Sequence, residues 1–214
     1  MKAAIAPTES EVDALYRATT NPTLIVVPPL RFLCMDGQGD PNTSPAYAEA
    51  IQALYSVAYT LKFTIKKAGG PTFKVAPLEG LWWADDPAAF ANGEKSAWNW
   101  TMMIRVPDVV TDELFEECRE TVATKKSMPA ARELRLSTFE EGTAAQILHV
   151  GPYASEGPTI LRLHDFIRAL GFTFDDSRYQ HHEIYLGDPR RTAPERLRTI
   201  IRQPYADPHS ANPQ

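Results

Sequence analysis

All four tryptophans of this 214-residue chain lie between positions 82 and 100. Two strands joined by the loop 84–95 would pair antiparallel and bring the indoles together at the mouth of that loop. Two of the four share a strand face, and two adjacent ones point to opposite faces. Aromatic residues most often form a core or an interface, but several indoles beside an acidic loop also suit a flat ligand. Both interpretations stay open for Trp82, Trp83, Trp98 and Trp100.

A second group of reactive side chains is the run His181-His182-Glu183-Ile184-Tyr185. In a strand, His181, Glu183 and Tyr185 face one way. The group is either a solvated strand face with a surface ion pair or a partly buried carboxylate with a raised pKa. Such a carboxylate would act as a base on water or pair with a cationic ligand. A zinc site is excluded because adjacent histidines point apart and no further ligand is suitably spaced.

The turn His149-Val-Gly-Pro-Tyr153 is the third candidate. Its Gly-Pro pair forces a tight bend and places Tyr153 near the start of a helix, where the ring either caps the core or points its hydroxyl into a cleft. Nucleophilic catalysis has little support, because no Gly-x-Ser-x-Gly occurs and neither Cys34 nor Cys118 has an evident histidine partner. The reaction that these residues suit is attack by water, assisted by a carboxylate and a phenol.

The composition limits the partners. A formal net charge of -5 argues against a general nucleic-acid binder. The two distant cysteines fit reduced packing residues of an intracellular protein. No secretory signal or membrane-spanning apolar run is visible. We therefore expect a cytoplasmic protein with no metal, cofactor, nucleic acid or membrane partner.

Hydrophobic periodicity and turn residues predict an α+β fold. Helix-start residues occur at 8–11, a β-rich run with two prolines covers 23–35, and turn residues cover 36–42. The remaining pattern contains strand, long helix, strand and strand twice, which would let two modules cover each other's open sheet faces. The predicted helices are 45–67, 111–123 and 156–170, and the predicted strands are 73–75, 78–83, 98–106, 143–150, 181–186 and 197–202.

Together these segments resemble the soluble GyrI-like proteins. The resemblance runs from about Leu15 to Arg202 with the motifs in the family's order, and the departure is Gly187, where relatives often carry serine. The motifs are residues 37–42, 50–63, 77–83, 98–105, 149–153 and 181–191.

The resemblance implies two pseudo-symmetric strand–helix–strand–strand modules that form antiparallel sheet around a central ligand cleft. Residues 1–205 would be a single domain with a disordered tail at 206–214. Module one would cover about 23–106, a linking helix 111–123, and module two about 143–203.

The resemblance also implies a function. In multidrug-sensing relatives a glutamate of the penultimate strand lies at the bottom of the cleft, and Glu183 occupies the matching position. One stand-alone branch hydrolyses the cyclopropane of DNA-alkylating compounds of the yatakemycin and CC-1065 type, using an aromatic cage that the tryptophans and Tyr153 resemble.

On that basis the expected ligand is a planar, apolar small molecule. Glu183 would orient or deprotonate the attacking water, Tyr153 would donate a hydrogen bond or hold that water, and Tyr185 and His149 would join the tryptophans as ligand contacts. The alternative is a non-catalytic module that binds or sequesters the molecule. A protein partner is not identified.

Overall fold

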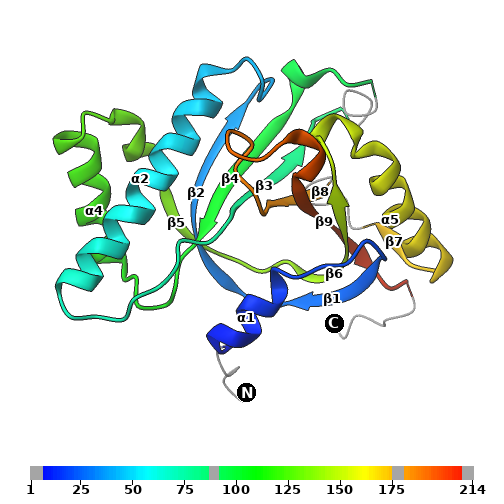
Figure 1. The fold of residues 1–214 in the computed structure, drawn as a ribbon, viewed down its shortest axis with the longest axis horizontal. Coiled ribbons are helices and arrows are strands. Elements are labelled where there is room, and N and C mark those ends of the chain that lie inside the picture. The colour runs from blue at the N-terminus through cyan, green and yellow to red at the C-terminus, as the bar shows by residue number, and fades with distance from the viewer. Residues whose placement is uncertain (1–6, 87–91, 175–180, 209–214) are drawn as a thin grey trace. The chain divides into compact units, whose positions relative to one another are not determined.

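The computed structural model describes residues 7–86, 92–174 and 181–208. The chain divides into two units. The central unit contains Leu30–Phe139 and Arg178–His182. The terminal unit contains Met1–Pro29, Glu140–Ser177 and Glu183–Gln214. Each unit is built around an antiparallel sheet with a long helix packed on it (Figure 1).

In the central unit the strands lie in the order β3-β4-β2-β5. The chain enters along β2, crosses the sheet as α2 and returns through β3 and β4 before α4 leads to β5. The elements are β2 (Leu30–Gln38), α2 (Pro45–Lys67), β3 (Leu78–Trp83), the short helix η1 (Lys95–Ala97), β4 (Asn99–Arg105), α4 (Asp112–Lys125), η2 (Pro129–Glu133) and β5 (Arg135–Phe139).

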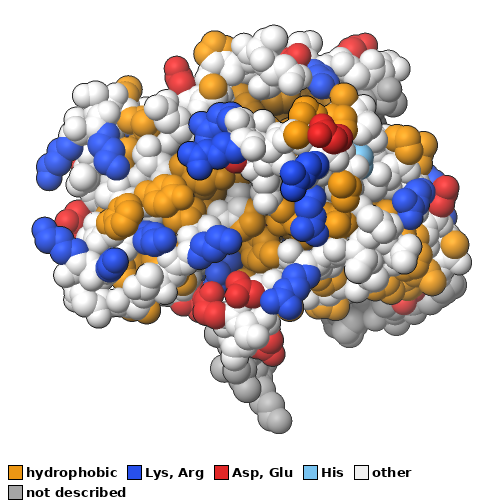
Figure 2. All heavy atoms as spheres, in the orientation of Figure 1, with side chains coloured by type: hydrophobic (Ala, Val, Ile, Leu, Met, Phe, Trp, Pro, Cys, Tyr) orange, Lys and Arg blue, Asp and Glu red, His pale blue; other side chains and the backbone are white. Residues whose placement is uncertain are grey.

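Local sequence explains why α2 begins and ends where it does. The Ser44 hydroxyl accepts a hydrogen bond from the Tyr47 amide, and Pro45 occupies the first turn, where its missing N–H costs nothing. Seven small or aliphatic residues form its buried stripe, which packs on β2 and β4. On the outer face Tyr55, Tyr59 and Phe63 stack in sequence, and Figure 2 shows hydrophobic side chains exposed over this helix.

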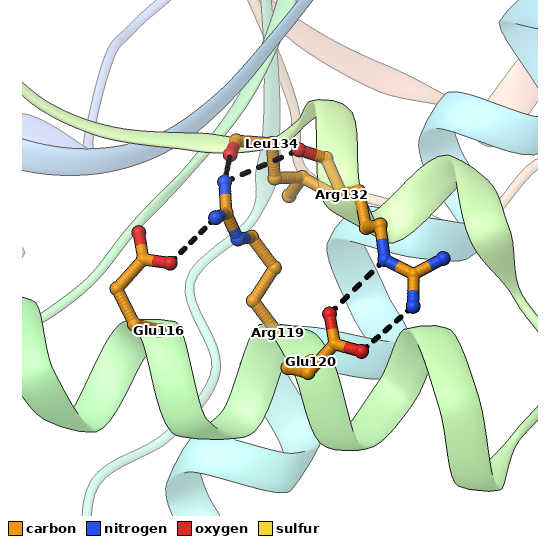
Figure 3. A network of polar contacts seen from close by, with 5 residues as sticks. All are labelled: Glu116, Arg119, Glu120, Arg132 and Leu134. Atoms are coloured by element: carbon orange, nitrogen blue, oxygen red, sulfur yellow. Dashed lines mark hydrogen bonds and ion pairs between the residues drawn. The ribbon is translucent and has the colours of Figure 1, made fainter.

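The hairpin between α4 and η2 is held by arginines (Figure 3). Arg119 donates to the carbonyl oxygens of Arg132 and Leu134 at 3.1 and 3.0 Å and pairs with Glu116. The Arg132 guanidinium makes two hydrogen bonds to Glu120, at 3.0 and 2.7 Å. These contacts fix the direction in which the chain enters β5.

In the terminal unit the order is β1-β6-β9-β8, and the two-residue β7 pairs with the end of β9. Helix α5 packs on β6 and β9 over a core of Ala145, Ile147, Leu163, Ile167 and Ile201. The elements are α1 (Glu9–Leu15), β1 (Thr23–Val27), β6 (Gly142–Val150), η3 (Tyr153–Ser155), α5 (Gly157–Ala169), β7 (Thr173–Phe174), β8 (His181–Tyr185), η4 (Pro194–Arg196) and β9 (Arg198–Ala206).

A buried ion network fixes the start of the terminal unit. Arg202 lies 3.2 Å from Glu141, and their side chains are 3% and 1% exposed. The Arg202 guanidinium also donates to the Gln146 side chain at 3.0 Å and to the carbonyl oxygen of Leu15 at the end of α1. The Gln146 amide in turn donates to the Arg17 carbonyl oxygen. The segment after α1 is thereby tied to β6 and β9.

The predicted α+β fold with a repeated strand–helix–strand–strand order is confirmed. The two copies are β2-α2-β3-β4 and β6-α5-β8-β9, and the outer strand beside β2 is β5, whereas the outer strand beside β6 is β1. Each outer strand therefore comes from the chain segment just before the other copy.

Several local predictions differ from the structure. The run 23–35 is two strands, because Pro28 and Pro29 cannot donate ladder hydrogen bonds and the chain leaves the sheet there. Residues 73–75 form no strand, and β5 and β7 were not predicted. Parts of the loop 84–95 and of the tail 206–214, namely 87–91 and 209–214, lie outside the described residues. Among the helices that the structure describes, none is long and apolar enough to cross a membrane.

Candidate functional site

The central unit gathers aromatic side chains at the start of α2. Trp82 of β3 lies directly opposite Trp100 of β4 in the ladder. Tyr47, in the first turn of α2, has its ring 6.0 Å from the Trp82 ring and 5.3 Å from that of Trp100, and Trp98 meets Trp82 edge-on at 5.9 Å. We call Tyr47, Trp82, Trp98 and Trp100 the aromatic cluster.

Burial divides this cluster into a floor and a surface. Trp82 and Trp100 are 4% and 1% exposed, so their rings are largely part of the core. Trp98 and Tyr47 are only half-buried, although Nε1 of Trp98 is buried. The Lys95 ammonium lies 5.5 Å from the Trp98 ring centre, in cation–π range. The part of the cluster that a flat molecule can reach is therefore formed by Trp98 and Tyr47.

A glycine makes room for the floor. Gly37 of β2 is the ladder partner of Trp100. A Cβ atom at Gly37 would lie 2.1 Å from the Trp100 ring, so the indole rests directly on the backbone of β2. The sequence pattern predicted a turn at 36–42, but β2 continues to Gln38 because its residues pair with β4.

Trp83 does not share this face. It follows Trp82 in β3 and therefore points to the opposite side of the sheet. Its ladder partner is Asn99, whose amide donates to Asp85 at 3.1 Å. Strand alternation thus separates Trp83 from the three tryptophans that the structure groups.

The terminal unit places two carboxyl groups together at the start of α5. Glu183 is half-buried in β8, and Glu156 is the residue that precedes the first turn of α5, 5% exposed. Oε1 of Glu156 is buried without a hydrogen-bond partner in the structure. We call Glu156, Glu183, Tyr153 and Tyr185 the acidic cluster.

The electrostatics of this pair are unusual. Burial, and then the charge of Glu183, raise the pKa of Glu156 to about 9, and the neighbouring Thr199 hydroxyl opposes the shift only in part. At neutral pH Glu156 is therefore protonated beside the Glu183 carboxylate. Two neighbouring carboxyl groups of unequal burial are an arrangement that general acid–base chemistry uses.

Two phenols flank the carboxyl groups. Tyr185 lies two residues after Glu183 in β8 and so shares its face. The ring of Tyr153, in η3, meets the Tyr185 ring edge-on at 5.6 Å, and Tyr153 is 38% exposed. The structure thus brings three of the residues singled out in the sequence, Glu183, Tyr153 and Tyr185, into one cluster.

His149 has a different environment. It is 5% exposed, its Nδ1 lies 3.0 Å from the Thr159 hydroxyl, and its Nε2 lies 3.3 Å from the Pro152 carbonyl oxygen. Both ring nitrogens are thus engaged by the β6–α5 turn. His149 holds the turn that carries Tyr153, and a direct ligand contact remains only a prediction.

Sequence reasoning did not assign Glu156 or Tyr47 to a site. Each was read only as part of a helix, although both lie at a helix start beside proline, before Pro158 and after Pro45 respectively. Glu156 is the N-cap of its helix and Tyr47 is the third residue of its own, so the signal available in the sequence was a reactive or aromatic side chain within the start of each helix.

Other chemistry has less support. Cys34 and Cys118 are free and buried, and burial raises the pKa of Cys34 to about 12, so its thiol stays protonated at neutral pH. Within the described ranges 7–86, 92–174 and 181–208, no group of three or more His, Cys, Asp or Glu residues is arranged to hold a metal ion.

Comparisons with known proteins identify the family and support the fold. A family model described as a GyrI-like small molecule binding domain matches residues 20–206. An uncharacterized conserved protein from Listeria innocua is 38% identical, with a TM-score of 0.85 over 92% of this chain and 98% of its own. A structure titled a hydrolase from Listeria innocua is 37% identical, with a TM-score of 0.80 and the same coverage.

A more distant structure shares the fold alone. The EcmrR C-terminal domain is 13% identical, with a TM-score of 0.55 over 87% of this chain and 97% of its own. No match was found among curated proteins.

Proposed function

Because the chain belongs to the GyrI-like family of small-molecule-binding domains, we propose that it binds planar, apolar molecules and hydrolyses a cyclopropane conjugated to a dienone, as in yatakemycin and CC-1065. The observation that carries this proposal is the buried carboxyl group of Glu156, which lies beside Glu183 at the start of α5. Two Listeria innocua structures about as long as this chain, each 37% identical to it, are titled hydrolases, which supports catalysis.

The proposed reaction needs few protein groups. Glu183 takes a proton from water as the water oxygen bonds to the cyclopropane CH₂ carbon. The ring C–C bond breaks, and its electron pair moves through the dienone to the carbonyl oxygen, which becomes a phenol oxygen after protonation. Aromatisation of the product drives the opening, and the balance is substrate plus one water.

The chemistry of this proposal lies within the terminal unit. The aromatic cluster of the central unit is proposed separately, as a surface on which a planar molecule stacks. Tyr153 and Glu156 are the two O–H donors of the acidic cluster that can stabilise developing negative charge on the carbonyl oxygen. The proposal places no step on His149 or on either cysteine.

The test follows the products. Purified protein at a small fraction of the concentration of a yatakemycin-type compound is expected to yield, by mass spectrometry, a product heavier by one water, and Glu183→Gln is expected to lose this turnover. In H₂¹⁸O the product must carry the heavy oxygen. Absence of turnover in the wild-type protein would contradict hydrolysis.

A non-catalytic binding module is the second candidate. It is favoured by the description of the family, which names small-molecule binding and no reaction. It predicts saturable binding of the intact compound at one molecule per chain without a product. Calorimetric titration beside the mass measurement separates the two functions.

A further inference from the structure

We infer that Thr199 is a positioning residue of the acidic cluster, because its buried hydroxyl is the hydrogen-bond donor for Oε1 of Glu156 and keeps the proton of that carboxyl group on Oε2. The bond fixes the orientation of the carboxyl group, and its consequence for turnover rests on the proposed function. Thr199 lies in β9 and Glu156 at the start of α5, and both belong to the terminal unit.

Thr199 and Glu156 each bury a polar atom without a partner. Thr199 is fully buried, and Glu156 is 5% exposed. Within the described part of the chain, neither Oγ1 of Thr199 nor Oε1 of Glu156 has a hydrogen-bond partner. An unpaired buried polar atom costs free energy, so native proteins almost always pair such atoms. The Thr199 hydroxyl neighbours the Glu156 carboxyl group, and pairing these two atoms satisfies both.

His149 is the other polar neighbour of Thr199, as its ladder partner in β6. Residues directly opposite in a ladder share a face, and Ile201, two residues after Thr199, packs against α5 on that face. However, Nδ1 of His149 lies 3.0 Å from the Thr159 hydroxyl, and its Nε2 lies 3.3 Å from the Pro152 carbonyl oxygen. Both ring nitrogens are engaged there, so of these two neighbours Glu156 is the one left for the Thr199 hydroxyl.

The direction of the bond decides where the proton of Glu156 lies. Burial, and then the charge of Glu183, raise the pKa of Glu156 to about 9, so its carboxyl group keeps a proton at neutral pH. A neutral carboxyl group has one O–H donor and one acceptor oxygen. When Oε1 accepts from Thr199, it is the acceptor, and the proton is on Oε2. The O–H group then points away from β9, as a general acid for a ligand oxygen requires.

The experiment compares two substitutions of Thr199. Thr199→Val removes the hydroxyl and nearly keeps the shape of the side chain, whereas Thr199→Ser keeps the hydroxyl. Thr143→Val is the matched control, because the Thr143 hydroxyl also joins β6 to β9 but donates to the Tyr205 carbonyl oxygen, at 3.2 Å. Carboxyl ¹³C chemical shifts of labelled glutamate follow the Glu156 titration, and kinetics with the yatakemycin-type compound give kcat and KM. A crystal structure of the wild-type protein gives the distance between the two oxygens.

We expect Thr199→Val to raise the pKa of Glu156 further, because a hydrogen bond from the hydroxyl favours the charged carboxylate. Its kcat should fall about 10²-fold with little change in KM, because a misplaced reacting group costs about that much. Thr199→Ser and Thr143→Val should keep the wild-type titration and kcat. In the crystal, Oγ1 of Thr199 and Oε1 of Glu156 should lie about 2.7 Å apart.

A wild-type titration and kcat in Thr199→Val would overturn the inference. An equal loss in Thr199→Ser would also contradict it, since the hydroxyl would then not be the group that matters. If Thr199→Val does not fold, the crystal structure decides: a separation beyond about 3.5 Å, or a water molecule between the oxygens, excludes the direct bond. If the wild-type protein shows no turnover, the proposed hydrolysis fails, whereas the titration and the distance still test the bond.

Discussion

The two units repeat one arrangement of elements with different chemistry at the same place. In each, a residue at the start of the long helix lies beside the next two strands: Tyr47 contacts β3 and β4, and Glu156 neighbours Glu183 of β8 and Thr199 of β9. In the central unit this place holds Tyr47, Trp82 and Trp100, and in the terminal unit it holds Glu156 and Glu183. The repeated fold places the start of a long helix beside two strands in each unit. The residue types at that position determine whether it suits aromatic stacking or proton transfer.

The difference between the clusters also concerns energy. Burial of aromatic side chains stabilises the folded state, so the aromatic cluster stabilises the central unit. Two neighbouring carboxyl groups, one of them buried, oppose folding unless one keeps its proton. The terminal unit therefore carries a local destabilisation of the kind that functional sites show. Changes to the two clusters should consequently have different kinds of effect.

The largest effect should come from the charge of Glu183. We expect Glu183→Gln to lower kcat about 10²–10⁴-fold, the usual contribution of a positioned base, with little change in KM. Steady-state kinetics with the yatakemycin-type compound measure both constants. Glu195→Gln, an exposed glutamate in η4, is the matched control and should behave as wild type. A parallel rise in KM would instead assign Glu183 to ligand binding.

The second effect concerns pH and stability. The folded protein keeps the Glu156 proton up to a pKa of about 9, whereas the unfolded chain releases it near the ordinary value of 4.5. The folded state thus binds more protons between these values, and the free energy of unfolding falls as pH rises through this window, by at most about 1.4 kcal/mol per pH unit.

Glu156→Gln removes this titration. The difference in the free energy of unfolding, wild type minus variant, should therefore decrease from pH 5 to pH 9, as measured by urea denaturation at each pH. Asp165→Asn, an exposed acid on α5, should show no such trend. A difference that stays constant with pH would mean that Glu156 is ionised in the folded protein.

These two carboxyl groups also show what the sequence could and could not reveal. Glu183 and Tyr185 were assigned to one face because alternation in a strand is a local rule. Glu156 was missed because its environment depends on β8 lying beside the start of α5, which no local pattern encodes. Likewise Trp98 and Trp100 were grouped correctly, but Tyr47 joins them only through the packing of α2 on the sheet.

The fold shows the same division between local and non-local information. The apolar period of residues 45–67 predicts α2 closely, and the structure adds the Ser44 cap. The sequence pattern merges β1 with β2, because the partner strand β6 is more than a hundred residues away and Pro28-Pro29 also fits an edge or a bulge. Strand β5 has no strong alternation, and its pairing with β2 decides its conformation.

The third effect is steric and belongs to the aromatic cluster. A methyl group at Gly37 would meet the Trp100 ring at 2.1 Å, so Gly37→Ala must displace the indole and should cost about 1–3 kcal/mol of stability. Thermal or urea unfolding measures this loss. The double variant Gly37→Ala/Trp100→Leu should recover part of it, since the smaller side chain leaves room for the methyl group. The control is Gly157→Ala, because a Cβ atom at Gly157 meets nothing within 4 Å. Gly93→Ala is unsuitable, because Gly93 has a positive φ.

The smallest effect, and the one that separates stacking from packing, should come from Trp98. Because Trp98 is half-buried, Trp98→Ala should cost less stability than Trp100→Ala yet weaken binding of the planar ligand by about 1–2 kcal/mol, or roughly 5–30-fold in Kd. Phe63→Ala removes an exposed aromatic ring from the outer face of α2 and should leave Kd unchanged. Trp83→Ala tests the opposite strand face. If Trp83→Ala weakens binding and Trp98→Ala does not, the ligand binds the sheet face that carries Trp83. The aromatic cluster is then part of the hydrophobic core, and it shares with the acidic cluster its position in the repeat but no role in ligand binding.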